Sequence, residues 1–239
     1  MYTNKWILST YIIFLAVLPM LLSGCDEGIP GNGNTIKEER DVKDFSEIRV
    51  GDAFKVILTQ GSEEKLVIEA DDNLMKYITA RVSGSTLVID TRERIEHSSM
   101  LVAHITFKDL KYMDLSGACE LINRDTISLQ ELRIEGSGAS QLDMTMNLEK
   151  LILDLSGASE IDLAGSASNF DANLSGAADL TADDFMAENV RIDISGAGTA
   201  RVYATVELDA RVSGAASVRY KGNPKVTQDV SGAGSVSPL

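Results

Sequence analysis

Hydrophobic and polar residues follow a long, steady period in the C-terminal half of the chain. The tripeptide Ser-Gly-Ala occurs there seven times, at intervals of 21, 19, 19, 20, 18 and 18 residues. The copies begin at Ser116, Ser137, Ser156, Ser175, Ser195, Ser213 and Ser231. Self-similarity at a fixed spacing is typical of proteins in which one small structural unit stacks on itself. The pattern therefore predicts an array of stacked repeats.

Three positions of each repeat are mostly apolar when the copies are aligned on the motif serine. They lie three residues and one residue before the serine and five after it, so even numbers separate them, as on one face of a β-strand. The same register places on this face the motif glycine and the residue three after the serine, which is small in every copy. We expect these small residues at a corner where one strand bends into the next and leaves little room. They are Cys119, Ser140, Ser159, Ala178, Gly198, Ala216 and Gly234.

These features predict an all-β fold, a parallel β-helix (β-solenoid) with 18 to 21 residues per coil. At roughly 3.3 Å per residue, one repeat amounts to roughly 65 Å of extended chain, about the circumference of a tube filled with side chains. Leucine-rich repeats have a similar period, but they would require a helix and an asparagine ladder, and the sequence shows neither.

Residues 41–108 alternate less regularly than the repeats. Short apolar alternations are separated there by Gly51, Gly61 and Gly84, a pattern typical of short strands joined by turns. We interpret this segment as irregular N-terminal coils and a β cap, with one helical turn at residues 72–76 and an exposed charged loop at residues 91–99. Residues 109–239 carry the Ser-Gly-Ala repeats, and because no linker separates the two parts, residues 41–239 are predicted to form a single domain.

The first residues predict the compartment. Lys5 precedes an apolar run at residues 6–22, which ends in Leu22-Ser23-Gly24-Cys25. This tetrapeptide resembles the bacterial lipoprotein cleavage box, in which the cysteine is lipidated and becomes the new N-terminus. Residues 1–24 are then a lipoprotein signal peptide, Cys25 is the lipidation site, and residues 25–40 are a flexible tether. The alternative is an uncleaved anchor, but 17 residues are at the short end for a spanning helix.

Charge restricts the partners. The chain carries a formal net charge of −14, and the mature chain without Lys5 has 21 basic and 36 acidic residues, a net charge of −15. Nucleic acid is excluded as an expected partner because phosphate binding requires a basic surface. The expected contact is a membrane, through the lipid on Cys25. We therefore expect an outer-membrane lipoprotein of the bacterial cell envelope, on either the periplasmic face or the cell surface.

Few residues are candidates for chemistry. His97 and His104 have no visible partner and are expected to be structural rather than general bases. Cys119 occupies the small inward column and is expected to be buried, and no Cys/His cluster has zinc spacing. The motif serines lack a Gly-x-Ser-x-Gly elbow, so we expect them to form a hydroxyl ladder that hydrogen-bonds along the tube. The sequence therefore predicts no catalytic residue and no cofactor.

One outward column of the repeats is mostly acidic. Two residues before the motif serine, five of seven positions are carboxylates, namely Asp114, Glu135, Asp154, Asp193 and Asp229, with Asn173 and Arg211 between them. Like charges on adjacent strands repel, and calcium, which prefers carboxylate oxygens, would relieve that repulsion. The other interpretation is that these carboxylates are exposed to solvent and bind no metal ion, and this is the one that we expect.

Several segments resemble a known family. They are Phe45-Ser46-Glu47-Ile48-Arg49-Val50, Phe54-Lys55-Val56-Ile57-Leu58-Thr59-Gln60-Gly61, Ser83-Gly84-Ser85-Thr86-Leu87-Val88-Ile89 and the recurring Leu-Ser-Gly-Ala-Ser units. Together they resemble the auto-transporter adhesin head (GIN) domain of Bacteroidetes lipoproteins, over nearly the whole mature chain. The resemblance implies a β-helical envelope protein and supplies no catalytic or ligand-binding residues.

Three functions remain open at this point. The first is a non-catalytic, adhesin-like binding module for a glycan or a protein on the envelope surface. The second is a structural envelope spacer. The third is a carbohydrate-active enzyme, because polysaccharide lyases and hydrolases also use parallel β-helices, although fold alone does not determine function. The sequence favours the binding module because it contains no convergent set of catalytic groups.

Overall fold

The fold is built from β-strands. A computed structural model describes residues 28–96 and 100–239, and every regular element in those ranges is a strand, which confirms the predicted all-β class. None of the described residues forms a helix with the length and hydropathy needed to cross a membrane. The predicted signal peptide, the predicted lipidation site Cys25 and His97 lie outside the described residues.

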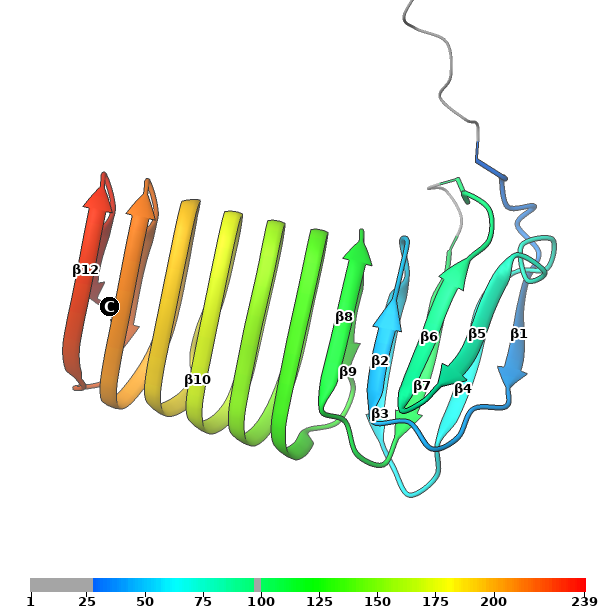
Figure 1. The fold of residues 1–239 in the computed structure, drawn as a ribbon, viewed down its shortest axis with the longest axis horizontal. Helices are drawn as coiled ribbons and strands as arrows, with labels where there is room; N and C mark the ends of the chain where they lie inside the picture. Colours follow the sequence, from blue (N-terminus) through cyan, green and yellow to red (C-terminus); the bar gives the residue numbers. More distant parts are fainter. Residues whose placement is uncertain (1–27, 97–99) are drawn as a thin grey trace, which may run out of the picture.

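The repeats form one continuous extended segment. Strand β10 (Ile127–Gly214) is 88 residues long and winds through successive turns that lie side by side (Figure 1). The first turn pairs in parallel with β8 (Tyr112–Gly117) and β9 (Glu120–Asn123). The last pairs in parallel with β11 (Ser217–Lys221) and β12 (Lys225–Gly232), and β13 (Ser235–Pro238) follows on β11. Because each turn is one sequence period long, Ser137 pairs with Ser116 and Ser231 with Ser213, so equal positions stack in columns.

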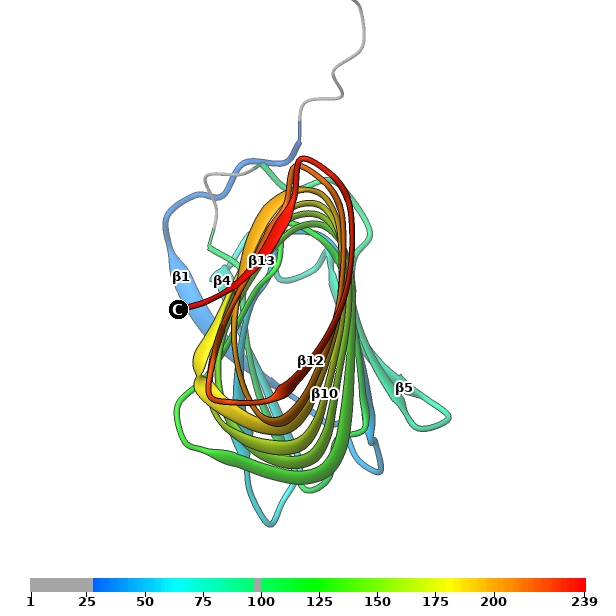
Figure 2. The same cartoon turned by 90° about the vertical axis from the view of Figure 1, so that its left-hand side faces the viewer.

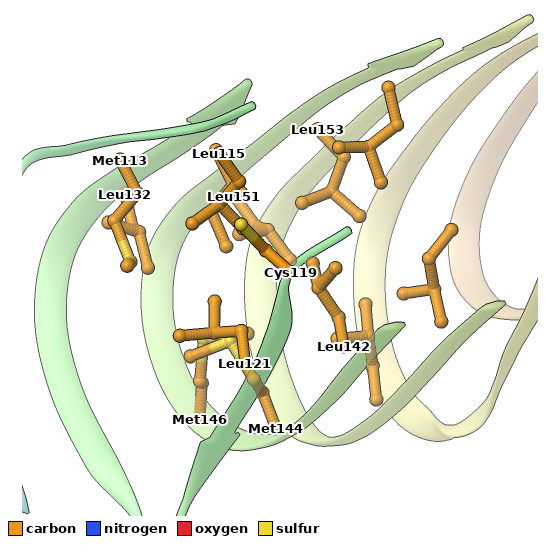
Figure 3. Close-up of a cluster of buried hydrophobic side chains, with 14 of the residues drawn as sticks. Met113, Leu115, Cys119, Leu121, Leu132, Leu142, Met144, Met146, Leu151 and Leu153 are labelled. Atoms are coloured by element: carbon orange, nitrogen blue, oxygen red, sulfur yellow. The ribbon is translucent and has the colours of Figure 1, made fainter. Parts of the chain in front are cut away.

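The inward columns form the core. Viewed along the stack, the turns trace an oval outline (Figure 2), and apolar side chains from neighbouring turns meet inside it (Figure 3). In the first six copies, the apolar residues of the three predicted columns are each 3% exposed or less. They are Met113, Leu115, Leu121, Ile134, Leu142, Leu153, Leu155, Ile161, Ala172, Leu174, Leu180, Ile192, Ile194, Ala200, Ala210, Val212 and Val218.

The last copy departs from this pattern. Val230 occupies the same column as Leu155 but is 39% exposed, against 3% for Leu155. Among the described residues, β12 pairs only with β10 and β13 only with β11. The inward side chains of this last copy therefore stay partly exposed, because no further described turn covers them.

The motif glycine does not point inward, so that prediction is wrong. Gly157 is exposed and has φ +110°, and a Cβ at this position would lie 2.1 Å from the carbonyl oxygen of Gly138. The glycine is needed because the backbone turns the corner with a positive φ in contact with the backbone of the previous turn. The residue two positions later does point inward as predicted, with Cys119, Ser140 and Ser159 each 7% exposed or less.

The N-terminal strands close one end of the stack. They are β1 (Thr35–Arg40), β2 (Glu47–Val50), β3 (Lys55–Gln60), β4 (Lys65–Asp71), β5 (Ile78–Ser83), β6 (Thr86–Thr91) and β7 (Val102–Phe107). Here the spatial order departs from the chain order, since β2 lies between β6 and β8, and β3 lies between β7 and β9. Antiparallel pairs appear only here among the described residues, between β1 and β4, β4 and β7, and β5 and β6.

Two local predictions in this region are wrong. Residues 72–76 form consecutive turns, closed by bonds such as Leu74 N to Asp71 O, and not a helix. The predicted tether does not extend to residue 40, because β1 begins at Thr35 and pairs with β4 along its length. Ile29 also forms an isolated bridge with Ile95, so the chain is already attached to the cap there.

Candidate functional site

The acidic row lies on the outward face beside the motif corner. Glu135 pairs with Asp114 in register, and Asp229 pairs with Arg211, as stacking of the repeats requires. A hollow of about 570 Å³ runs across these turns. Its polar lining consists of Asp114, Glu135, Asp154, Asn173 and Asp193 from the row and Ser137, Ser156, Ser175 and Ser195 from the motifs.

Three carboxylates of this row, those of Asp114, Glu135 and Asp154, are bound by neighbouring side chains. Arg133 Nε lies 2.6 Å from Glu135 Oε1, and Arg133 Nη2 lies 2.6 Å from Asp154 Oδ2. Arg49 Nε lies 2.9 Å from Asp114 Oδ2, and the amide of Asn173 donates to Asp154 Oδ1 at 2.6 Å. At these three positions, the guanidinium and amide groups offset the repulsion between neighbouring carboxylates. A bound calcium ion would have had the same effect.

Tyr112 completes the network around Glu135. Its hydroxyl donates to Glu135 Oε2 at 2.7 Å. Burial, followed by this bond to a carboxylate, raises the pKa of Tyr112 to about 12. The hydroxyl of Tyr112 and the guanidinium of Arg133 lower the pKa of Glu135 below its usual value. At neutral pH the tyrosine is thus neutral and the glutamate ionised, so the network holds one fixed charge state.

The same face continues as a surface of alternating charges. Lys150 lies 3.7 Å from Asp171, and Asp209 lies 4.0 Å from Arg191 and 3.8 Å from Arg211. Two smaller hollows, of about 420 and 310 Å³, occur between these side chains. Such a surface offers ion-pair and hydrogen-bond partners at regular intervals, which suits recognition of a polar, repetitive ligand.

The serine column does not form the predicted ladder. Among the described residues, Ser156 is the only motif serine whose hydroxyl makes a hydrogen bond along the stack, donating to the carbonyl oxygen of Gly136 at 3.4 Å. Of the other motif serines that line the hollow, Ser137 and Ser175 are exposed and Ser195 is half-buried. These hydroxyls are therefore available to a ligand.

His104 has a structural contact. Its Nε2 lies 2.9 Å from Glu69 Oε2, and Lys37 Nζ lies 3.1 Å from the same oxygen, so the three residues connect β7, β4 and β1. The hydrogen bond from His104 is the main cause that lowers the pKa of Glu69. This cluster lies away from the hollow beside the acidic row.

Cys119 is a buried core residue, as predicted. It is 2% exposed, and its Sγ lies 3.4 Å from the carbonyl oxygen of Asp52. Burial raises the pKa of the thiol to about 11, so the reactive thiolate is scarce at neutral pH. Within residues 28–96 and 100–239, no group of three or more His, Cys, Asp or Glu side chains is placed to hold a metal ion.

Sequence reasoning missed the partners of the acidic row. Tyr112 and Arg133 occupy the column two residues before it, on the same outward face of the strands. The period-two rule that assigned the acidic column applies equally to this one. Comparing this column with the acidic column, repeat by repeat, would have indicated that basic and acidic side chains lie next to each other.

The geometry defines a class of protein, an all-β chain that carries a repetitive polar surface on stacked turns. The model of the family described as "Putative auto-transporter adhesin, head GIN domain" matches residues 44–224, and this chain belongs to that family. The family resemblance inferred from the sequence is thereby confirmed.

Solved structures share the fold. A "putative adhesin" from Bacteroides fragilis is 24% identical, with a TM-score of 0.83, and the match covers 89% of this chain and 100% of that one. A "putative lipid binding protein" from Parabacteroides distasonis is also 24% identical with the same coverage and a TM-score of 0.67. A "putative adhesin" from Parabacteroides merdae is 22% identical, with 88% and 98% coverage and a TM-score of 0.66. At these identities the likeness concerns the fold alone. None of the curated proteins matches the sequence.

Proposed function

We propose that this protein is a lipid-anchored parallel β-solenoid of the bacterial envelope that acts as a non-catalytic, adhesin-like binding module for a glycan or a protein. The observation that carries the proposal is the hollow beside the acidic row, where exposed hydroxyls lie next to carboxylates held by Arg133, Arg49 and Asn173. Side chains already held in place lose little entropy when a ligand binds, which favours binding.

The stacking of equivalent positions in successive turns supports this role. Parallel pairs join positions one period apart, and the same motif residues meet in successive turns. Such a stack presents one polar column many times along its length, as extended repeat proteins do on their binding surfaces. The family name and the neighbours described as adhesins agree with a surface role.

The anchoring half of the proposal rests on Leu22-Ser23-Gly24-Cys25. Cells grown with a fatty-acid probe should incorporate it into the wild-type protein and not into Cys25→Ser, which should also leave the membrane fraction. Cys119→Ser is the matched control, because it removes the other thiol of the chain and should keep the label. A wild-type protein that stays in the membrane without label would show that the apolar segment is an ordinary anchor.

The binding half is tested on a glycan array and on intact cells with the full chain in detergent. Ser156→Tyr and Ser175→Tyr fill the hollow and should lower binding at least about tenfold, the scale of losing a central contact. Thr181→Tyr is the control, since Thr181 is exposed in the same region but does not line the hollow. Equal binding by all three variants would exclude this surface.

The two other functions predict different outcomes of the same experiment. A structural spacer would bind no glycan or cell surface, and its loss would change the envelope and not adhesion. A carbohydrate-active enzyme would release shortened glycan from the array with time. Non-catalytic binding requires a stable signal with no product.

A further inference from the structure

Four cationic side chains line one hollow at the N-terminal end of the molecule, although the whole chain has a net charge of −14. They are Arg40 of β1, Lys76 of the turns after β4, Arg81 of β5 and Arg92 just beyond β6. The hollow has a volume of about 790 Å³, larger than the one beside the acidic row. We call it the basic hollow.

The basic hollow lies between the two edge strands of the sheet. Strands β1 and β5 are the two ends of the strand order, and among the described residues each pairs on one side only, with β4 and β6 respectively. Both lie at the capped end of the stack (Figure 1). Side chains from the two terminal strands therefore face a shared space.

The cations in the basic hollow are poorly neutralised. Within the described residues, the guanidinium groups of Arg81 and Arg92 have no ion pair or hydrogen bond. Lys76 Nζ contacts only an aromatic ring, 4.8 Å from the centroid of Tyr77. Arg40 contacts Glu38 at 3.1 Å, but its Nε is buried and has no acceptor. Arg40 Nη2 also donates to the carbonyl oxygen of Met75 at 3.4 Å, so the cations open to a ligand are those of Arg81, Arg92 and Lys76.

The acids of the basic hollow are engaged elsewhere. Both oxygens of Asp72 accept hydrogen bonds at 2.6 Å, one from Asn32 and one from Asn34. Asp90 Oδ1 accepts the backbone N–H of Thr91 at 2.9 Å. Neutral donors do not cancel the charge of a carboxylate, so the four cations and three acids of the lining leave a formal net charge of +1. Only Glu38 pairs with a cation of the set, which leaves the guanidinium groups of Arg81 and Arg92 as the cationic partners for a ligand.

The position of the basic hollow indicates the source of the anion. Ile29 is already bound to the cap, its N–H donating to Arg94 O at 2.8 Å. Gly28 is three residues from Cys25, a distance of at most roughly 11 Å of extended chain. If Cys25 carries a lipid, as proposed above, this end of the molecule lies against the bilayer. An exposed apolar side chain occurs in the hollow as well, that of Ile36, at 39% exposure.

We propose that the basic hollow binds the phosphate of an anionic phospholipid headgroup in the membrane that anchors the chain. Arg81 and Arg92, which are both exposed, would pair with the phosphate, and Ile36 would contact the acyl boundary. Guanidinium groups suit phosphate because they donate two parallel hydrogen bonds. A cationic and apolar surface beside a lipid anchor is typical of membrane-surface binding. The inference rests on the proposed anchoring for its choice of lipid as the phosphate source.

The test is a titration of the full chain in neutral detergent, where binding does not depend on the lipid at Cys25. The probes are short-chain phosphatidylglycerol, short-chain phosphatidylcholine and inorganic phosphate. Phosphatidylglycerol should bind in a saturable way, at least about tenfold more tightly than the other two, and more weakly at high salt. Arg81→Glu with Arg92→Glu should weaken this binding at least about tenfold, since each cation near an anionic headgroup contributes substantially.

Arg219→Glu with Lys225→Glu is the matched control. It makes the same change in charge on exposed residues of β11 and β12, at the other end of the stack, and should leave binding unchanged. Equal affinity for both lipids, or for inorganic phosphate and phosphatidylglycerol, would overturn the headgroup assignment. Binding unchanged in the Arg81 and Arg92 variant would overturn the site. Failure of fatty-acid labelling at Cys25 would instead contradict the anchoring proposal and leave this titration interpretable.

Discussion

Each motif glycine stands where the chain turns the corner and touches the turn before it. Gly138, Gly157 and Gly176 have φ values of +111°, +110° and +102°, and a Cβ on any of them would lie 2.1 to 2.4 Å from the carbonyl oxygen of the preceding motif glycine. In the coil before the first motif, Asp52 occupies the position of the motif glycine, with φ +61°. The carbonyl oxygen of Asp52 accepts a hydrogen bond from the N–H of Ala118. The contact is between backbones, so it demands glycine in every later turn.

Replacing Gly157 with alanine should therefore be severe. Strain at positive φ together with overpacking against Gly138 should lower the free energy of unfolding by roughly 2–5 kcal/mol. Gly84→Ala is the control, because Gly84 has φ +64° but nothing within 4 Å of the position of its Cβ, and it should lose only about 1–2 kcal/mol. Urea unfolding of both variants measures the difference, and equal losses would contradict the backbone contact.

At the scale of the turn, stability comes from columns of inward side chains that are covered by turns on both sides. Leu155 lies in the middle of the stack and is 3% exposed, whereas Val230 in the last turn is 39% exposed. Position in the stack therefore changes the cost of the same substitution within one column.

Leu155→Asp should lower the free energy of unfolding by more than about 3 kcal/mol, because it buries a carboxylate without a partner. Val230→Asp should lower it by less than about 1 kcal/mol, as expected for a largely solvated site. Thermal and urea unfolding of the pair tests this. Comparable losses would mean that the last turn is covered in solution.

The outward network of the same turns makes stability depend on pH. The pKa of Glu135 is lower in the folded protein than its ordinary value of 4.5. Its contribution is therefore full above about pH 4.5 and is lost as the pH falls through the folded-state pKa. The wild type should lose free energy of unfolding as the pH falls from about 5 to 3, and Glu135→Gln should lose less over the same range. The difference between the two should be under about 1 kcal/mol, because the side chain of Glu135 is partly exposed.

Glu160→Gln is the matched control for this measurement, because Glu160 is exposed and, among the described residues, has no ion pair. Its profile should follow that of the wild type. A Glu135→Gln profile that also coincides with the wild type would show that Tyr112 and Arg133 do not stabilise the carboxylate in solution.

At the scale of the whole molecule, acidic charge is spread along the stack and is paired with cations at only part of the acidic row. Arg133 contacts both Glu135 and Asp154, and Arg49 contacts Asp114. Among the described residues, Arg81 and Arg92 have no ion-pair partner, and both lie at the capped end, in the basic hollow.

This arrangement predicts no specific calcium effect. Millimolar calcium and magnesium should shift the melting temperature equally and slightly, because both only screen exposed charges. The comparison of the two ions by calorimetry is the measurement. A shift specific to calcium that disappears in the Glu135→Gln, Asp154→Asn double variant would instead make the row a binding site.

Prediction from the sequence succeeded where one turn resembles the next. Leu155, Leu174 and Ile194 were assigned to the core by period and parity alone, and the small column at Cys119 and Ser159 was placed inward correctly. Prediction failed for the motif glycine, because parity cannot reveal a positive φ at the corner. The pairing of Asp154 with Arg133 was also missed, since it joins two columns in different turns.

The sequence by itself determined the all-β class, the family, the inward columns and the absence of a recognisable catalytic motif, because these depend on local periodicity repeated at a fixed spacing. Only the tertiary structure decided the insertion of β2 and β3 between later strands, the ion-pair network on Glu135 and the basic hollow between β1 and β5. Each of these joins segments tens of residues apart, and no local pattern encodes which distant strand edges and side chains meet when the chain packs.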